Sequence, residues 1–134
     1  MINTIFEAIQ EHLSMLDLAV SSSEKIKKFA KNENLEAVIT ETENRERIVN
    51  IVGQIQRNIE DQINLLNPEE IPADGISILK SWFHDLTILS EKMLSIDKET
   101  VDFLSQQKEG AAKEISLIFK NKEIIKSYNH EGSK

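Results

Sequence analysis

Apolar side chains recur at intervals of three and four residues along the first part of the chain. This spacing places them on one face of a helix, so we predict a helix over residues 3–30. The stripe consists of Ile2, Ile5, Phe6, Ile9, Leu13, Leu16, Val20 and Ile26. Three consecutive serines at 21–23 weaken the helix in its middle, where a kink is expected.

A second apolar stripe predicts a helix over residues 34–66, with Asn32 or Asn34 as its N-cap. The stripe consists of Leu35, Val38, Ile39, Ile48, Val49, Val52, Ile55, Ile59, Ile63 and Leu66. Residues 40–47 are polar or charged throughout, and we interpret them as solvated or in contact with a polar partner. Arg45 and Arg47 are accordingly assigned to an exposed charged face.

Both prolines of the chain fall in residues 67–75, which we predict to be a loop. A third helix is predicted over 76–128, with Asp74 or Ser77 as its cap and a bend at Asp97 or Gly110 as an alternative to one continuous rod. Trp82 and Phe83 form an aromatic pair early in its apolar stripe and are interpreted as core packing. Residues 129–134 form a polar tail.

These three segments define the fold class as all-α. We expect a single domain over residues 1–134, built of three or four long antiparallel amphipathic helices that pack like a coiled coil. Such long helices on a chain of 134 residues leave parts of their apolar stripes without an internal partner. This surplus of apolar surface predicts a binding surface.

Composition narrows the function classes. The net charge of −7 disfavours nucleic-acid binding, and the absence of cysteine excludes disulfides and thiolate metal sites. The first residues lack a basic segment and carry Glu7 and Glu11, which is unlike a signal peptide. No apolar run approaches the ~20 residues of a membrane span. We therefore expect a cytoplasmic protein.

No catalytic, cofactor or metal site is predicted. The residues three positions before His12, His84 and His130 are not glutamates, so the Glu-x-x-His motif of di-iron bundles is absent. His12 and His84 are interpreted as ordinary boundary histidines, although phosphotransfer through His84 stays open as a minor alternative. The carboxylates lie among lysines at helical spacing, as on a solvated surface. We do not expect an enzyme.

The last third of the chain carries a family resemblance. Lys120-Asn121-Lys122-Glu123-Ile124-Ile125-Lys126-Ser127-Tyr128 is a lysine-rich aliphatic stretch that stops at a tyrosine, and Arg45-Glu46-Arg47-Ile48 lies in an acidic second helix. Together with the size and the order of long helices, these segments resemble the FlgN/FliT-type flagellar type III export chaperones. The resemblance extends over nearly the whole chain.

This resemblance implies a cytoplasmic chaperone for flagellum assembly. Such a protein binds the C-terminal amphipathic helix of a hook-associated or filament-cap protein, prevents premature self-assembly and delivers its client to the export gate. The candidate client-binding residues are Leu104, Ala111, Ile115, Ile118, Phe119 and Ile125. Tyr128 is the candidate export-gate contact. In some members the last helix folds back over the client groove, and Gly110 would be the hinge here.

A different class of function fits the same stripes. A self-associating coiled-coil protein, structural or adaptor and without a flagellar role, would satisfy its apolar faces with a second copy. The sequence leaves open whether the protein is a monomer or a homodimer, which client it binds, and whether it serves another secretion route.

Overall fold

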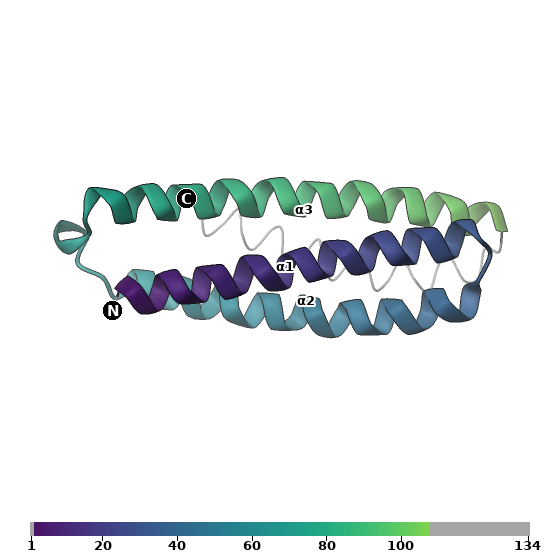
Figure 1. The fold of residues 1–134 in the computed structure, drawn as a ribbon, viewed down its shortest axis with the longest axis horizontal. Helices are drawn as coiled ribbons and strands as arrows, with labels where there is room; N and C mark the ends of the chain where they lie inside the picture. The colour runs from purple at the N-terminus through teal and green to yellow at the C-terminus, as the bar shows by residue number, and fades with distance from the viewer. Residues whose placement is uncertain (1, 108–134) are drawn as a thin grey trace.

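A computed structural model describes residues 2–107, which form three long α-helices and no strand (Figure 1). The helices are α1 (Ile2–Lys31), α2 (Leu35–Asn64) and α3 (Ala73–Gln107), with a short 3₁₀ helix, η1 (Pro68–Glu70), before α3. The prediction of an all-α fold of long helices is confirmed. The part of the predicted third helix beyond Gln107 lies outside the described residues.

Each helix buries one continuous seam whose residues alternate between steps of three and four. This is the heptad spacing of a coiled coil, in which core positions a and d lie on one face. On α1 the seam is Ile5, Ile9, His12, Leu16, Ala19, Ser23, Ile26 and Ala30; on α2 it is Val38, Thr42, Arg45, Val49, Val52, Gln56 and Ile59; on α3 it includes Gly75, Trp82, Leu86, Met93, Ile96 and Thr100.

The helix α1 runs between the other two in Figure 1, antiparallel to α2 and parallel to α3. It packs against both, whereas no Cα atom of α2 comes within 8 Å of a Cα atom of α3 in the described helices. In a four-helix bundle each helix touches two neighbours and not the helix diagonal to it. The three described helices therefore occupy three corners of a four-cornered bundle, with α2 and α3 diagonal to each other.

The turn between α1 and α2 is a Schellman motif. The N–H of Asn34 donates to the carbonyl of Phe29 at 2.9 Å, and the N–H of Glu33 donates to that of Ala30 at 3.1 Å. Asn34 also caps α2, because its side-chain oxygen accepts the N–H of Ala37 at 3.2 Å. The choice between Asn32 and Asn34 is thus settled, and the chain reverses within a few residues.

Glu33 adopts the left-handed conformation, with φ 60°, at the position of this motif that glycine usually occupies. A Cβ atom is strained there. We expect Glu33→Gly to raise the free energy of unfolding by about 0.5–1 kcal/mol, measured by urea denaturation. Glu36→Gly, in the first turn of α2, should instead lower stability; equal effects of the two substitutions would contradict this assignment.

Two predicted interruptions are absent. The helix α1 continues through residues 21–23, where Ser23 Oγ donates to the carbonyl of Ala19 at 3.0 Å, and α3 continues through Asp97. The loop is also shorter than predicted, because α3 begins at Ala73 and takes in Asp74 and Ser77. Serine tolerates a helix interior when its hydroxyl bonds the preceding turn.

Candidate interaction surfaces

A buried hydrogen-bond network joins all three helices near one end of the bundle. Trp82 Nε1 donates to His12 Nδ1 at 3.1 Å, and the two rings meet edge to face at 5.4 Å. His12 Nε2 lies 3.4 Å from Gln56 Oε1, and Gln56 Nε2 donates to Glu60 at 3.2 Å. Since Nδ1 is an acceptor, the proton of the neutral ring is assigned to Nε2.

This network requires a neutral imidazole. Burial lowers the pKa of His12 to about 4, with a partial opposing effect of the bond to Gln56. Burial also raises the pKa of Glu60, again against the effect of Gln56. The interpretation of His12 as a boundary residue is therefore wrong: it is fully buried, whereas His84 is exposed. Counting seam positions regardless of residue type would have found it.

A buried ion pair connects the diagonal helices. Arg45 Nη2 on α2 donates to Asp97 Oδ2 on α3 at 2.7 Å, and their side chains are 2% and 6% exposed. Burial lowers the pKa of Arg45 and the Asp97 carboxylate raises it, but arginine stays charged at any ordinary pH. The assignment of Arg45 to an exposed charged face is wrong because it occupies a seam position. Arg47 is exposed, as predicted.

The ion pair lies where the hydrophobic core divides. The larger cluster extends from Ile5 to Val20 on α1, and a smaller one comprises Ile26, Ala30, Val38 and Leu104. Between them the buried residues are largely polar, including Ser22, whose hydroxyl donates to Glu41 at 3.0 Å. Because polar contacts are directional, this layer fixes how the helices align along their length more strictly than apolar packing does.

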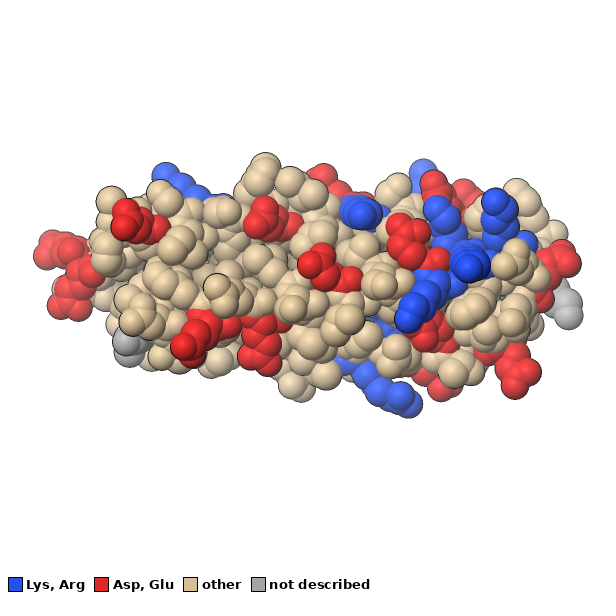
Figure 2. Space-filling model, viewed as in Figure 1, with Lys and Arg blue, Asp and Glu red and all other residues tan. Residues whose placement is uncertain are grey.

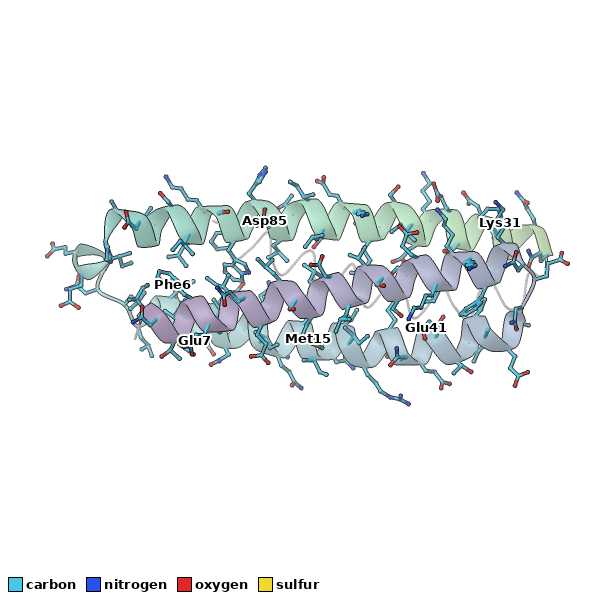
Figure 3. All side chains as sticks on the ribbon, viewed as in Figure 1. Phe6, Glu7, Met15, Lys31, Glu41 and Asp85 are labelled. Atoms are coloured by element: carbon cyan, nitrogen blue, oxygen red, sulfur yellow. The ribbon has the colours of Figure 1, made fainter. Side chains whose placement is uncertain are left out.

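The corner diagonal to α1 is the first candidate interaction surface, and we name it the fourth corner. Figure 3 labels Phe6 on the α3 side of α1, and Met15 and Glu41 between α1 and α2. The opposite flanks of α2 and α3, heptad position e, border the fourth corner. They carry Ile39, Glu46, Gly53 and Glu60 on α2 and Ile76, Phe83, Ser90, Asp97 and Leu104 on α3.

The middle of the fourth corner is lined by small residues. The Arg45–Asp97 contact aligns α2 antiparallel to α3, and by this alignment Gly53 lies level with Ser90. Both are buried. Glycine inside a helix costs about 1 kcal/mol relative to alanine, and small side chains let a further helix approach closely. Towards the ends, Ile39 and Ile76 are 42% and 43% exposed.

Among the residues proposed from the sequence to bind a client, Leu104 falls in the described part. It is 2% exposed and packs with Ile26, Ala30 and Val38, so it belongs to the intramolecular core. Trp82 is also a core residue, as predicted. The other candidates lie outside the described residues: Ala111, Ile115, Ile118, Phe119, Ile125, the export-gate candidate Tyr128 and the hinge candidate Gly110.

Residues 2–107 contain no cluster of three or more histidine or acidic side chains that could hold a metal ion. Within the same part of the chain, no helix has the length and apolar character needed to cross a membrane. Comparison with protein-family models, with curated proteins and with solved structures gives no significant match.

Proposed function

We propose that the protein is a flagellar export chaperone of the FlgN/FliT type, acting in the cytoplasm. Its client is the C-terminal amphipathic helix of a hook-associated or filament-cap protein, which it keeps from premature self-assembly and delivers to the export gate. The family resemblance of residues 34–66 and 120–128 motivates this proposal, and the all-α fold of long helices agrees with it.

One observation carries the proposal: α1 packs on both α2 and α3, whereas no Cα atom of α2 lies within 8 Å of a Cα atom of α3 in the described helices, and the two meet through side chains such as Arg45 and Asp97. Among the described helices this leaves the fourth corner unfilled, and a helix along α2 and α3 would fit its direction. A client helix there would lay its apolar side along α2 and α3, which is helix-in-groove recognition. Gly53 and Ser90 would allow a close approach, and Ile39, Ile76 and Phe83 would supply apolar contacts.

The candidate residues of the C-terminal segment add a second element. Ala111, Ile115, Ile118 and Ile125 recur at steps of three, four and seven, as a helix seam does. We propose that they contact the client together with the fourth corner, and that Tyr128 contacts the export gate. Leu104 would take part only through its position in the core at the end of α3.

Calorimetric titration tests the proposal. The ligands are peptides of the C-terminal helices of the hook–filament junction proteins and of the filament cap from the same organism. We expect one-to-one binding at micromolar concentrations or below, with a negative heat-capacity change from apolar burial. Absence of binding to every such peptide would refute the chaperone function.

A matched pair of variants locates the site. Gly53→Leu places a large side chain in the fourth corner and is expected to weaken peptide binding at least tenfold. Gln54→Leu adds the same side chain one residue further on, at an exposed position outside this corner, and should leave binding unchanged. Binding that is equally tight in both variants would move the client away from the fourth corner.

A further inference from the structure

The outer face of α1 points away from both packed neighbours, and its charges are ordered along the helix. We define this face by seven exposed residues: Glu7, Glu11, Ser14, Leu18, Ser21, Lys25 and Lys28. Residues 2–17 contain three acidic side chains and no lysine or arginine, whereas residues 18–31 contain four lysines and one glutamate. One half of the face is thus acidic and the other basic.

The charge order is antisymmetric about Leu18. Glu11 lies one heptad before Leu18 and Lys25 one heptad after it, so all three share a line along the helix. Glu7 and Lys28 stand about three turns from Leu18 on either side. In Figure 2 acidic side chains predominate at the end of the bundle that holds η1, and basic ones gather towards the other end.

Leu18 belongs to an exposed apolar band across the middle of the bundle. The Trp82–His12 contact aligns α3 with α1 at a separation of 70 residues, which brings Ile88 level with Leu18. The His12–Gln56 contact aligns α2 in the opposite direction and brings Ile51 to the same level. Leu18, Ile51 and Ile88 are 53%, 42% and 49% exposed.

Leu18 and Ile51 lie on the same side of the bundle. Each occupies heptad position c, which adjoins the flank where α1 and α2 meet, as the labels of Met15 and Glu41 in Figure 3 show. Position c of Ile88 adjoins the flank of α3 that meets α1, and α1 turns its other flank, which carries Phe6, towards α3. In Figure 1 α1 passes in front of the end of α2, so the face seen in Figure 2 includes the outer side of α1. Single exposed apolar residues are ordinary on a protein surface, but two side by side at one level form a patch.

We propose that this face binds the same face of a second copy of the chain, across a two-fold axis that crosses α1 at Leu18. The two α1 helices then run antiparallel, with Leu18 against Leu18 of the second copy. Glu11 meets Lys25, Glu7 meets Lys28, and Ser14 meets Ser21, whose small side chains permit close approach. The same rotation brings Ile51 against its own counterpart.

Charge selects the antiparallel arrangement. A parallel pairing would place acidic halves together and lysines together, whereas the antiparallel one brings opposite charges into contact. The helix dipole accounts for acids early and lysines late in α1, but it does not account for an apolar band at the midpoint. A helix of 30 residues is about 45 Å long, so a face about 20 Å wide offers about 900 Å², near the usual 800 Å² per partner.

Sedimentation equilibrium of the full chain tests the pairing. We expect a monomer–dimer equilibrium that weakens with added salt. Lys25→Glu with Lys28→Glu should raise the dissociation constant at least tenfold. Adding Glu7→Lys and Glu11→Lys to the same chain inverts both halves and should restore the dimer. A monomer at all concentrations would overturn the proposal. So would a fourfold variant whose dimer dissociates as readily as that of the double variant.

Cross-linking tests the orientation, since the chain has no cysteine of its own. Under oxidation Leu18→Cys should form a disulfide-linked dimer. Glu11→Cys should not, because residue 11 of each copy lies against Lys25 of the other copy and not against residue 11. A mixture of Glu11→Cys and Lys25→Cys chains should cross-link again. Efficient cross-linking of Glu11→Cys with itself would show a parallel pairing and overturn the proposal.

The outer face of α1, which we name the dimer face, lies away from the fourth corner. Variants can therefore test dimer formation and peptide binding separately. Leu18→Glu should abolish the dimer and leave peptide binding intact, and Gly53→Leu should do the reverse. Leu18→Glu could instead lose peptide binding and sediment as the parent does. That result would mean that the client, and not a second copy, covers α1, and it would overturn the dimer. A dimer that persists without any peptide binding would sink the chaperone function alone.

Discussion

Asp97→Ala is expected to lower the free energy of unfolding by about 3–5 kcal/mol, the largest loss we anticipate from one substitution. The reason is the environment of Arg45, whose side chain is 2% exposed and lies 2.7 Å from the Asp97 carboxylate. The substitution takes away a charged acceptor of this buried guanidinium, and water does not replace it readily at this depth. Unfolding, which exposes the guanidinium to water, then becomes comparatively favourable.

Replacing both partners separates the cost of the lost partner from the worth of the pair. Arg45→Met with Asp97→Leu removes both charges of the pair, and its stability should lie within about 1 kcal/mol of the parent or above it. Urea denaturation followed by circular dichroism gives all three values. A double variant as unstable as Asp97→Ala would contradict the argument.

The exposed ion pair between Lys27 and Glu99 provides the control. It has a comparable separation, 2.8 Å, but the two side chains are 33% and 55% exposed. Water already solvates both groups, so Glu99→Ala should change stability little. A large loss there would mean that distance, and not burial, decides the cost of breaking such pairs in this bundle.

The buried pair of Arg45 and Asp97 marks the boundary between what the sequence predicts and what it does not. Long amphipathic helices, an asparagine cap at Asn32 or Asn34 and the proline-containing loop follow from local rules of spacing and capping, and they were predicted. Arg45 was assigned to an exposed charged face because it is charged and interrupts an apolar stripe, and His12 was interpreted as a boundary residue; Gln56 was not singled out. Their burial depends on partners more than forty residues away in sequence, which no local pattern reports.

The positions of the fourth corner and of the dimer face also could not be predicted from short-range sequence patterns. The length of the helices predicted a surplus of apolar surface, but not which side of which helix would carry it. That depends on α1 taking the position between α2 and α3. Once the buried side-chain contacts align the helices, Gly53 falls level with Ser90 and Leu18 with Ile88. The sequence contains these pairings only in combination with the packing.

Acidification is expected to destabilise the bundle through His12. Its pKa is about 4 in the folded protein and about 6.5 in the unfolded chain. Between these values the unfolded state binds more protons, so the free energy of unfolding rises with pH across this window. The contribution of His12 to stability is complete above pH 6.5 and is lost, by about 3 kcal/mol, as the pH drops to about 4.

The geometry explains why protonation is costly. A proton on Nδ1 would point at the N–H of Trp82, so two donors would meet where one donor and one acceptor now bond at 3.1 Å. The contact between α3 and α1 at this level would be lost. Glu60 acts in the opposite direction, because a raised carboxyl pKa favours the folded state at lower pH.

Two variants isolate the contribution of His12 from that of the carboxylates. His12→Gln keeps a neutral hydrogen-bonding group near Trp82 and removes the titration, so its stability should vary much less between pH 6.5 and 4. His84→Gln, at an exposed position, should retain the pH dependence of the parent. Urea denaturation at several pH values, followed by the fluorescence of Trp82, reports on the network directly, since Trp82 is the one tryptophan of the chain. Parallel pH profiles for the parent and His12→Gln would show that the buried imidazole does not govern acid stability.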